Sequence, residues 1–243
     1  MTDLNVYITE RLKINKDTGF EYKYFPENRK ELEKILRDLF DERGCDADLN
    51  DVDVSKVTDM SDLFKTIDRW YGRNIIRNIN ISRWDVSNVK SFDNAFTGCG
   101  RFNCDLSKWD VSSCVNFESM FENCQLFNSD LSDWNMNAAE KLNFMFLGCR
   151  KLDFDVSKWT FKNNHDFIRV FEGCVKFKGK GISKWDMKGA TSIFRMFNDC
   201  RQLKESPKSW DIKYGAIDMQ DTFTGCASIK DDLPKWYDQD YKP

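Results

Sequence analysis

Hydrophobic residues recur along most of this chain with a period of 25 or 26 residues. Three residue types keep this period: a tryptophan, a cysteine and, three positions before the cysteine, a phenylalanine. The tryptophans are Trp84, Trp109, Trp134, Trp159, Trp185, Trp210 and Trp236, the cysteines are Cys99, Cys124, Cys149, Cys174, Cys200 and Cys226, and the phenylalanines are Phe96, Phe121, Phe146, Phe171, Phe197 and Phe223. Because the three types stay in phase over six units, they identify an internal repeat.

The segment around each tryptophan predicts a short strand. In the unit at residues 106–111 the apolar positions are Leu106, Trp109 and Val111. Trp109 and Val111 are two residues apart, so they point to the same side of an extended chain. The same pair of apolar positions recurs in the other units, and we therefore expect one inward-facing strand per unit.

The segment before each cysteine predicts a helix of about two turns. Phe92, Ala95, Phe96 and Cys99 follow the i, i+3, i+4, i+7 spacing of one helix face. Residues suited to an N-cap precede this segment in five of six units, at Ser91, Asn116, Asp166, Ser192 and Asp218. Residues that tolerate the left-handed conformation precede each cysteine, at Gly98, Asn123, Gly148, Gly173, Asp199 and Gly225, and are expected to end the helix.

Together these signals predict an LRR-like α/β repeat solenoid of seven coils, each of about 25 residues with a short strand and a two-turn helix. The solenoid is expected over residues 49–229, with a degenerate first coil in which Trp70 is the last buried anchor. Residues 1–48 are expected to form an N-terminal capping hairpin and helix, and residues 230–243 a C-terminal cap and tail.

The N-terminal cap has its own pattern. Asn28 and Glu31 form a capping box at the start of a helix whose apolar stripe runs from Leu32 to Phe40, and Gly44 ends it. Before this helix, residues 4–9 and 20–25 alternate around a polar turn at residues 16–19, which predicts a hairpin.

Three segments resemble one known family. Residues 84–89 (Trp-Asp-Val-Ser-Asn-Val), followed by a Phe-rich segment, are similar to the repeats of the BspA-like leucine-rich repeat surface proteins, the DUF285 family. Residues 102–112 and 57–64 resemble the same repeats, and residues 24–64 are similar to the segment that leads into them. The resemblance covers nearly the whole chain. It implies an LRR-like solenoid and a role in adhesion or protein binding, with no catalytic residues.

Charge and composition narrow the location. The 37 basic and 40 acidic residues give a net charge of −3, so no strong field draws the chain to nucleic acid or to an anionic membrane. No apolar run approaches the roughly 20 residues that span a bilayer, and residues 1–10 lack the pattern of a secretory signal. Nine cysteines, an odd number, favour a reducing compartment, and we expect a cytoplasmic protein. The alternative is a cell-surface or secreted protein whose signal was removed.

No motif in the chain predicts catalysis, a cofactor or a metal site. The one histidine, His165, has no repeating nucleophile partner, and the periodic cysteines lack the C-x2-C clustering of zinc sites. The aspartates that follow the tryptophans recur in several units, whereas acid–base catalysis requires a single active site with a distinct environment. Glycine-rich phosphate loops are absent. We therefore expect a non-enzymatic protein without cofactor or metal.

Positions whose residue type varies between units are not required for the packing of one unit on the next. Two sets of such positions are candidates for binding a partner. The first is a lysine face in the C-terminal half: Lys158, Lys162, Lys184, Lys188 and Lys213. It either binds an acidic protein surface or is simply solvated, and interleaved aspartates disfavour nucleic acid. The second is an apolar set: Phe144, Leu147, Ile168 and Phe194. It either forms an interface, with self-association through Phe144, Ile168 and Phe194 as one form of it, or packs between neighbouring helices.

The function predicted from the sequence is a non-catalytic protein–protein interaction module that presents a rigid repeat surface to a macromolecular partner. The alternative is a bacterial-type surface or secreted adhesin whose export signal is absent from this chain.

Overall fold

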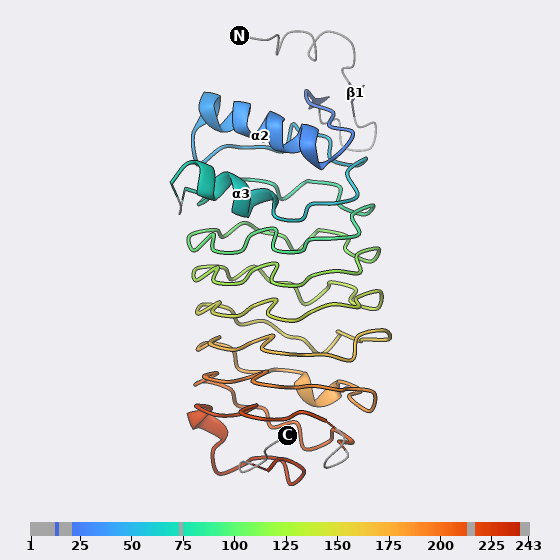
Figure 1. The fold of residues 1–243 in the computed structure, drawn as a ribbon, viewed down its shortest axis with the longest axis vertical. Coiled ribbons are helices and arrows are strands. Elements are labelled where there is room, and N and C mark those ends of the chain that lie inside the picture. Colours follow the sequence, from blue (N-terminus) through green and yellow to red (C-terminus); the bar gives the residue numbers. More distant parts are fainter. Residues whose placement is uncertain (1–12, 15–20, 73–74, 213–216, 239–243) are drawn as a thin grey trace.

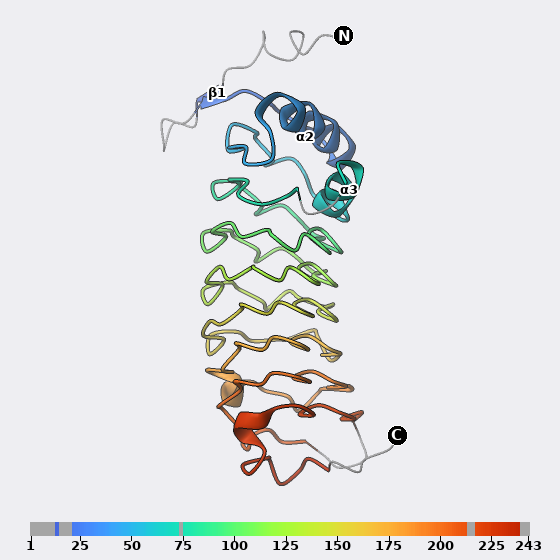
Figure 2. The ribbon, with the colours of Figure 1, turned by 90° about the vertical axis from the view of Figure 1, so that its left-hand side faces the viewer.

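The computed structural model describes residues 13–14, 21–72, 75–212 and 217–238. Over these residues the backbone winds into coils that stack into an elongated column (Figures 1 and 2). Strands β1 (Lys13–Ile14) and β2 (Glu21–Tyr22) pair antiparallel near one end, followed by helices α2 (Arg29–Arg43) and α3 (Leu63–Trp70). Two 3₁₀ turns lie further on, at Ile182–Lys184 and Ala227–Ile229.

Helix α2 covers the N-terminal end of the column (Figure 1). The Asn28 side chain accepts a hydrogen bond from the Glu31 backbone N–H at 3.1 Å, and Gly44, at φ 78°, ends the helix. Leu32, Leu36, Leu39 and Phe40 are buried against the first coil. The predicted capping helix is therefore confirmed. Of the predicted hairpin, residues 4–9 lie outside the described residues.

The predicted LRR-like α/β solenoid, with a strand and a two-turn helix in each of seven coils, is wrong. In the described residues from 75 onward there is no α-helix and no strand, and the two 3₁₀ turns and isolated parallel bridges, such as Ser91 with Asn116, are the regular elements. Helix α3, in the first coil, is the single α-helix among the described coils. Trp70, predicted as a buried anchor, ends this helix with 68% of its surface exposed.

Consecutive tight turns replace the predicted helices. The Ala95 N–H donates to the Phe92 carbonyl at 3.0 Å, and the Cys99 N–H donates to the Phe96 carbonyl at 2.9 Å. The third residue of each turn, Asn94 (φ 56°) and Gly98 (φ 79°), has positive φ, as in a type II turn. A helix that starts at Phe92 cannot pass through a left-handed residue at its third position, Asn94. The turns nevertheless bury the same residues that the helical spacing predicted.

The remaining backbone donors connect successive coils. The N–H groups of Phe92, Asn94 and Phe96 donate to carbonyls 24 residues further on, at 2.8 to 2.9 Å. Alternate residues therefore close a turn or bind the next coil, and the same alternation recurs along the column. Because every coil satisfies its neighbour's polar groups, coils that lack regular secondary structure can be buried side by side.

The predicted strands are also turns. The Trp109 N–H donates to the Leu106 carbonyl at 3.1 Å, and the Cys114 N–H donates to the Val111 carbonyl at 2.9 Å. Between the two turns, the Asp110 carboxylate accepts the Ser112 N–H at 3.0 Å. The alternation of apolar and polar residues therefore comes from turn positions and not from an extended chain.

The core is a set of aromatic and polar columns that run along the stack. Phenylalanine rings of successive coils stack with centroid separations of 5.4 to 5.8 Å, from Phe96 to Phe223. Each repeat tryptophan donates its indole N–H to a carbonyl of the preceding coil, as Trp134 does to Leu106 at 3.0 Å. These contacts fix the spacing of coils and hold outward-facing side chains at regular intervals.

Candidate functional site

The cysteine column has the properties of a packing element. Cys99, Cys124, Cys149, Cys174, Cys200 and Cys226 are all buried and unpaired. From Cys124 onward, each thiol donates to the carbonyl of the phenylalanine in the preceding coil at 3.0 Å. Burial raises the pKa of the Cys226 thiol to about 12, and it raises the pKa of the other five as well. Protonated, enclosed thiols are poor nucleophiles and poor metal ligands.

The recurrent aspartates have a structural role in turns. Asp85, Asp110 and Asp186 each accept the backbone N–H of the second following residue at 3.0 to 3.1 Å. The hydrogen bonds from Ser112 lower the pKa of Asp110, because they stabilise its charged form. His165 is exposed, and no group of three or more metal-binding side chains converges within the described ranges.

Ion pairs between neighbouring coils partly neutralise the lysine face. Within the face, Lys158 binds Asp133 at 2.5 Å, and beside the face Lys178 and Lys180 bind Asp153 and Asp155 of the preceding coil. Lys162, Lys184 and Lys188 are exposed and make no ion pair with another described residue. Lys213 lies outside the described residues. Three of the five predicted lysines thus keep an uncompensated charge.

The predicted apolar residues come together on successive coils. The Phe144 N–H donates to the Ile168 carbonyl at 2.9 Å, and the Arg169 N–H donates to the Phe194 carbonyl at 2.8 Å. Phe144, Leu147, Ile168 and Phe194 are half-buried, so each keeps part of its apolar surface in water. We call these four residues the apolar patch.

Two arginines that the sequence did not single out as binding residues lie beside the rings of the apolar patch. The Arg169 guanidinium lies 5.7 Å from the Phe144 ring centre, and the Arg195 guanidinium lies 5.3 Å from that of Phe194. Arg169 also binds Glu172, and Arg195 binds Asp221 at 3.1 Å. These pairs hold the guanidinium planes beside the rings. Aromatic rings with arginine are the composition enriched at protein interfaces.

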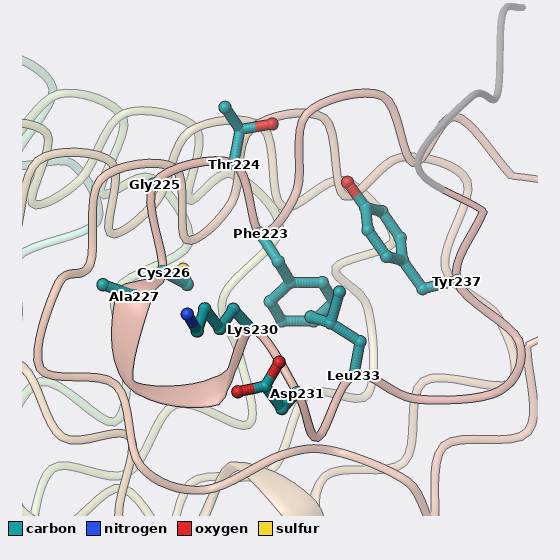
Figure 3. Close-up of a pocket in the computed structure, with 9 residues that line it drawn as sticks. All are labelled: Phe223, Thr224, Gly225, Cys226, Ala227, Lys230, Asp231, Leu233 and Tyr237. Atoms are coloured by element: carbon teal, nitrogen blue, oxygen red, sulfur yellow. The ribbon is translucent and has the colours of Figure 1, made fainter.

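The recesses on the described coils include two with mixed polar and apolar linings. One, of about 470 Å³, is lined by Asn123, Gln125, Gly148, Arg150, Gly173, Val175, Lys176, Asp199, Arg201 and Gln202. Sequence reasoning missed it, although two successive glycines at one position of the repeat signal a hollow. The other, of about 520 Å³, lies at the C-terminal end of the described coils, where Tyr237 and Leu233 stand beside Phe223 (Figure 3). Burial raises the pKa of Tyr237, so its hydroxyl stays protonated there.

Neither of the two α-helices in the described part of the chain has the length and apolar character that a membrane crossing requires. Comparison with curated proteins and with solved structures finds no match. Comparison with protein families finds one, described as Mycoplasma protein of unknown function, DUF285, over residues 34–153, 67–180 and 134–236. These overlapping matches cover most of the chain and confirm the resemblance seen in its repeats. The chain therefore belongs to the DUF285 family.

Proposed function

We propose that this protein is a non-catalytic binding module that contacts a partner protein through the apolar patch. The observation that carries the proposal is the gathering of Phe144, Ile168 and Phe194 on three successive coils. On other coils the position of Ile168 and Phe194 carries a polar residue (Asp93, Glu118, Asn143 and Gln220), and so does the position of Phe144 (Asn94, Ser119, Arg169, Arg195 and Asp221). Stacking therefore does not require apolar residues there, and a partner that covers them would gain hydrophobic free energy.

The chemistry of the remaining side chains supports a non-catalytic role. The periodic thiols are buried and protonated, and the recurrent carboxylates accept backbone hydrogen bonds in turns. A rigid column with a regular surface suits binding, because the contact residues lose little conformational freedom when a partner docks.

A pull-down from a lysate of the source cells tests the proposal. The baits are the unaltered protein, a variant with Phe144→Ser and Phe194→Ser, and a Leu126→Ser variant as control. Leu126 is 46% exposed and lies outside the apolar patch, so its replacement removes apolar surface elsewhere. We expect a partner that the control retains and the double variant loses. A partner retained by all three baits would contradict the role of the patch.

Self-association is the other outcome that the apolar patch allows. Sedimentation of the purified protein over a range of concentrations measures it. If the protein forms dimers that dissociate in the Phe144→Ser and Phe194→Ser variant, then the partner that covers the patch is a second copy of the chain.

We also propose a reducing, cytoplasmic location for this module. All nine cysteines are free, and eight of them are buried. To test the location, the protein is isolated from its source under conditions that prevent thiol oxidation and disulfide exchange, and its free thiols are titrated after denaturation. We expect nine reactive thiols, whereas native disulfides would instead favour an extracellular protein.

A further inference from the structure

The 470 Å³ recess exists because two neighbouring coils lack a side chain at the same position. Asn123, Gly148, Gly173 and Asp199 occupy equivalent places on four successive coils, and all four have positive φ, between 59° and 75°. The glycines lie between the two polar residues. The backbone N–H groups of both glycines donate to carbonyls of the next coil. These two N–H groups at the floor of the recess are therefore already hydrogen-bonded and do not bind a ligand.

Basic side chains from three successive coils line the recess. They are Arg150, Lys176 and Arg201, against one carboxylate, Asp199. Asp199 lies 3.6 Å from Arg201, and both side chains are more than half exposed, which makes the pair weak. Neither Arg150 nor Lys176 forms an ion pair with any residue of the described ranges. The recess is thus positively charged on a chain whose net charge is −3.

We propose that this recess binds an acidic segment of a partner protein, with a carboxylate side chain seated over Gly173 between the basic groups of Arg150, Lys176 and Arg201. The inference rests on the proposed binding function and names the chemistry of the partner. One residue of the apolar patch, Leu147, directly precedes Gly148, which lines the recess. The segment that fits both surfaces carries acidic and apolar side chains.

The lining favours a peptide over a nucleic acid. The amide side chains of Asn123, Gln125 and Gln202 can donate to and accept from a peptide backbone. No aromatic ring lines the recess, so bases have nothing on which to stack. Guanidinium groups bind carboxylates in a planar, two-point geometry that gives specificity as well as attraction.

Fluorescence polarisation of a labelled oligo-glutamate peptide, with a single-stranded oligonucleotide of equal charge as the comparison probe, tests the proposal on the full chain. We expect the Arg150→Glu and Lys176→Glu double variant to bind the peptide at least about tenfold more weakly, because two attractions become repulsions. The matched control is Lys30→Glu with Lys34→Glu, which changes the net charge equally at two exposed positions of helix α2 and should leave affinity close to that of the unaltered protein.

Two uncharged substitutions test the effect of the space in the recess separately from the effect of its charge. Gly173→Asn fills the recess with a residue that tolerates positive φ, and the nearest contact of its Cβ, at 3.5 Å, is ordinary. Gly98→Asn makes the same change at an equivalent position with open space around it, outside the recess. We expect weaker peptide binding for Gly173→Asn alone. Urea midpoints near that of the unaltered protein verify that all variants fold.

Three results would overturn the proposal: no peptide binding by the unaltered protein, equal loss in the recess variants and their controls, or tighter binding of the oligonucleotide than of the peptide. The pull-down with the Phe144→Ser and Phe194→Ser variant is independent of this titration. If that variant loses a partner while the peptide fails to bind, the binding function stands and the acidic-segment proposal falls.

Discussion

At the scale of the residue, the repeat tryptophans stabilise the fold both by filling the core and by the hydrogen bond of the indole N–H. The indole N–H of Trp134 donates to the Leu106 carbonyl at 3.0 Å in a fully buried setting. Replacing Trp134 with Phe removes the donor and leaves a small void, so we expect a loss of about 1–3 kcal/mol in the free energy of unfolding. Urea unfolding measures it. Trp236→Phe is the control, because Trp236 is only half-buried and should cost less; equal losses would contradict the argument.

The buried thiols predict how stability depends on pH. Burial raises the pKa of Cys226 and of Cys114 to about 12, whereas a thiol in the unfolded chain ionises near about 8.5. Above that pH the unfolded chain releases protons that the folded chain keeps. The free energy of unfolding should therefore fall as pH rises from about 8.5 toward 12, by about 1.4 kcal/mol per pH unit for each thiol.

Urea unfolding under reducing conditions from pH 7 to 10 measures this slope. Cys226→Ser keeps a donor for the Phe197 carbonyl but does not ionise in this range. Above about pH 8.5 the free energy of unfolding of this variant should fall less steeply with pH than that of the unaltered protein. Below about pH 8.5 the two curves should be parallel. Parallel curves over the whole range would contradict a protonated Cys226.

At the scale of the element, the sequence predicts which residues are buried better than it predicts how the backbone buries them. Phe92, Ala95, Phe96 and Cys99 have helical spacing and are buried, yet consecutive turns place them there. The left-handed residue that excludes a helix is Asn94 in that coil but Phe144, Arg169 and Arg195 in others. Phe and Arg carry no signal for positive φ, so the neighbouring coil's hydrogen bonds must impose it. Such long-range bonds are invisible in a single unit.

Two of the repeat intervals, Trp159 to Trp185 and Trp210 to Trp236, contain an additional residue, and in the first of them two glycines absorb it. Ten residues separate Cys149 from Trp159, whereas 11 separate Cys174 from Trp185. The longer segment contains Gly179 and Gly181, at φ 75° and 94°, and it leads into the 3₁₀ turn Ile182–Lys184. The carboxylate of Glu205 accepts the N–H groups of Gly181 and Ser183 at 2.8 Å and fixes this bulge against the next coil.

This bulge predicts an asymmetry between two glycine substitutions. A Cβ at Gly181 would lie 2.4 Å from the Ser157 Cα, a backbone atom that cannot move aside, whereas a Cβ at Gly98 meets nothing within 4 Å. Both residues have positive φ. We expect Gly98→Ala to cost about 1–2 kcal/mol from backbone strain alone, and Gly181→Ala to cost more than about 3 kcal/mol. Thermal or urea unfolding compares them, and similar costs would show that the bulge yields easily.

At the scale of the whole molecule, comparison of the units within one chain identified part of the candidate site. Phe144, Ile168 and Phe194 stood out because other units carry polar residues there, and the structure brings them together. The charge state of the lysine face was not foreseen, because the pairing of Lys158 with Asp133 depends on side-chain reach between coils. The recess at Gly148 and Gly173 is a property of two adjacent coils, which a unit-by-unit interpretation does not contain.

Because the hydrogen bonds between the described coils of the repeated part join neighbouring coils, one whole period should be removable. Deleting residues 117–141 joins Asn116 to Leu142, which occupies the place of Phe117 in the next coil. The shortened chain should close the same ladder between coils 25 residues apart and fold. Its free energy of unfolding should fall by about 1–4 kcal/mol, in proportion to the residues lost.

A deletion of half a period provides the control. Removing residues 117–128 joins Asn116 to Ser129, which shifts every tryptophan and cysteine out of its column between the two coils. Indole and thiol donors would then lose their carbonyl partners, and buried unsatisfied groups are costly. We expect cooperative urea unfolding with blue-shifted tryptophan fluorescence for the full-period deletion and neither for the half-period one. If both fold equally well, then loose hydrophobic packing and not the register of the ladder holds the column together.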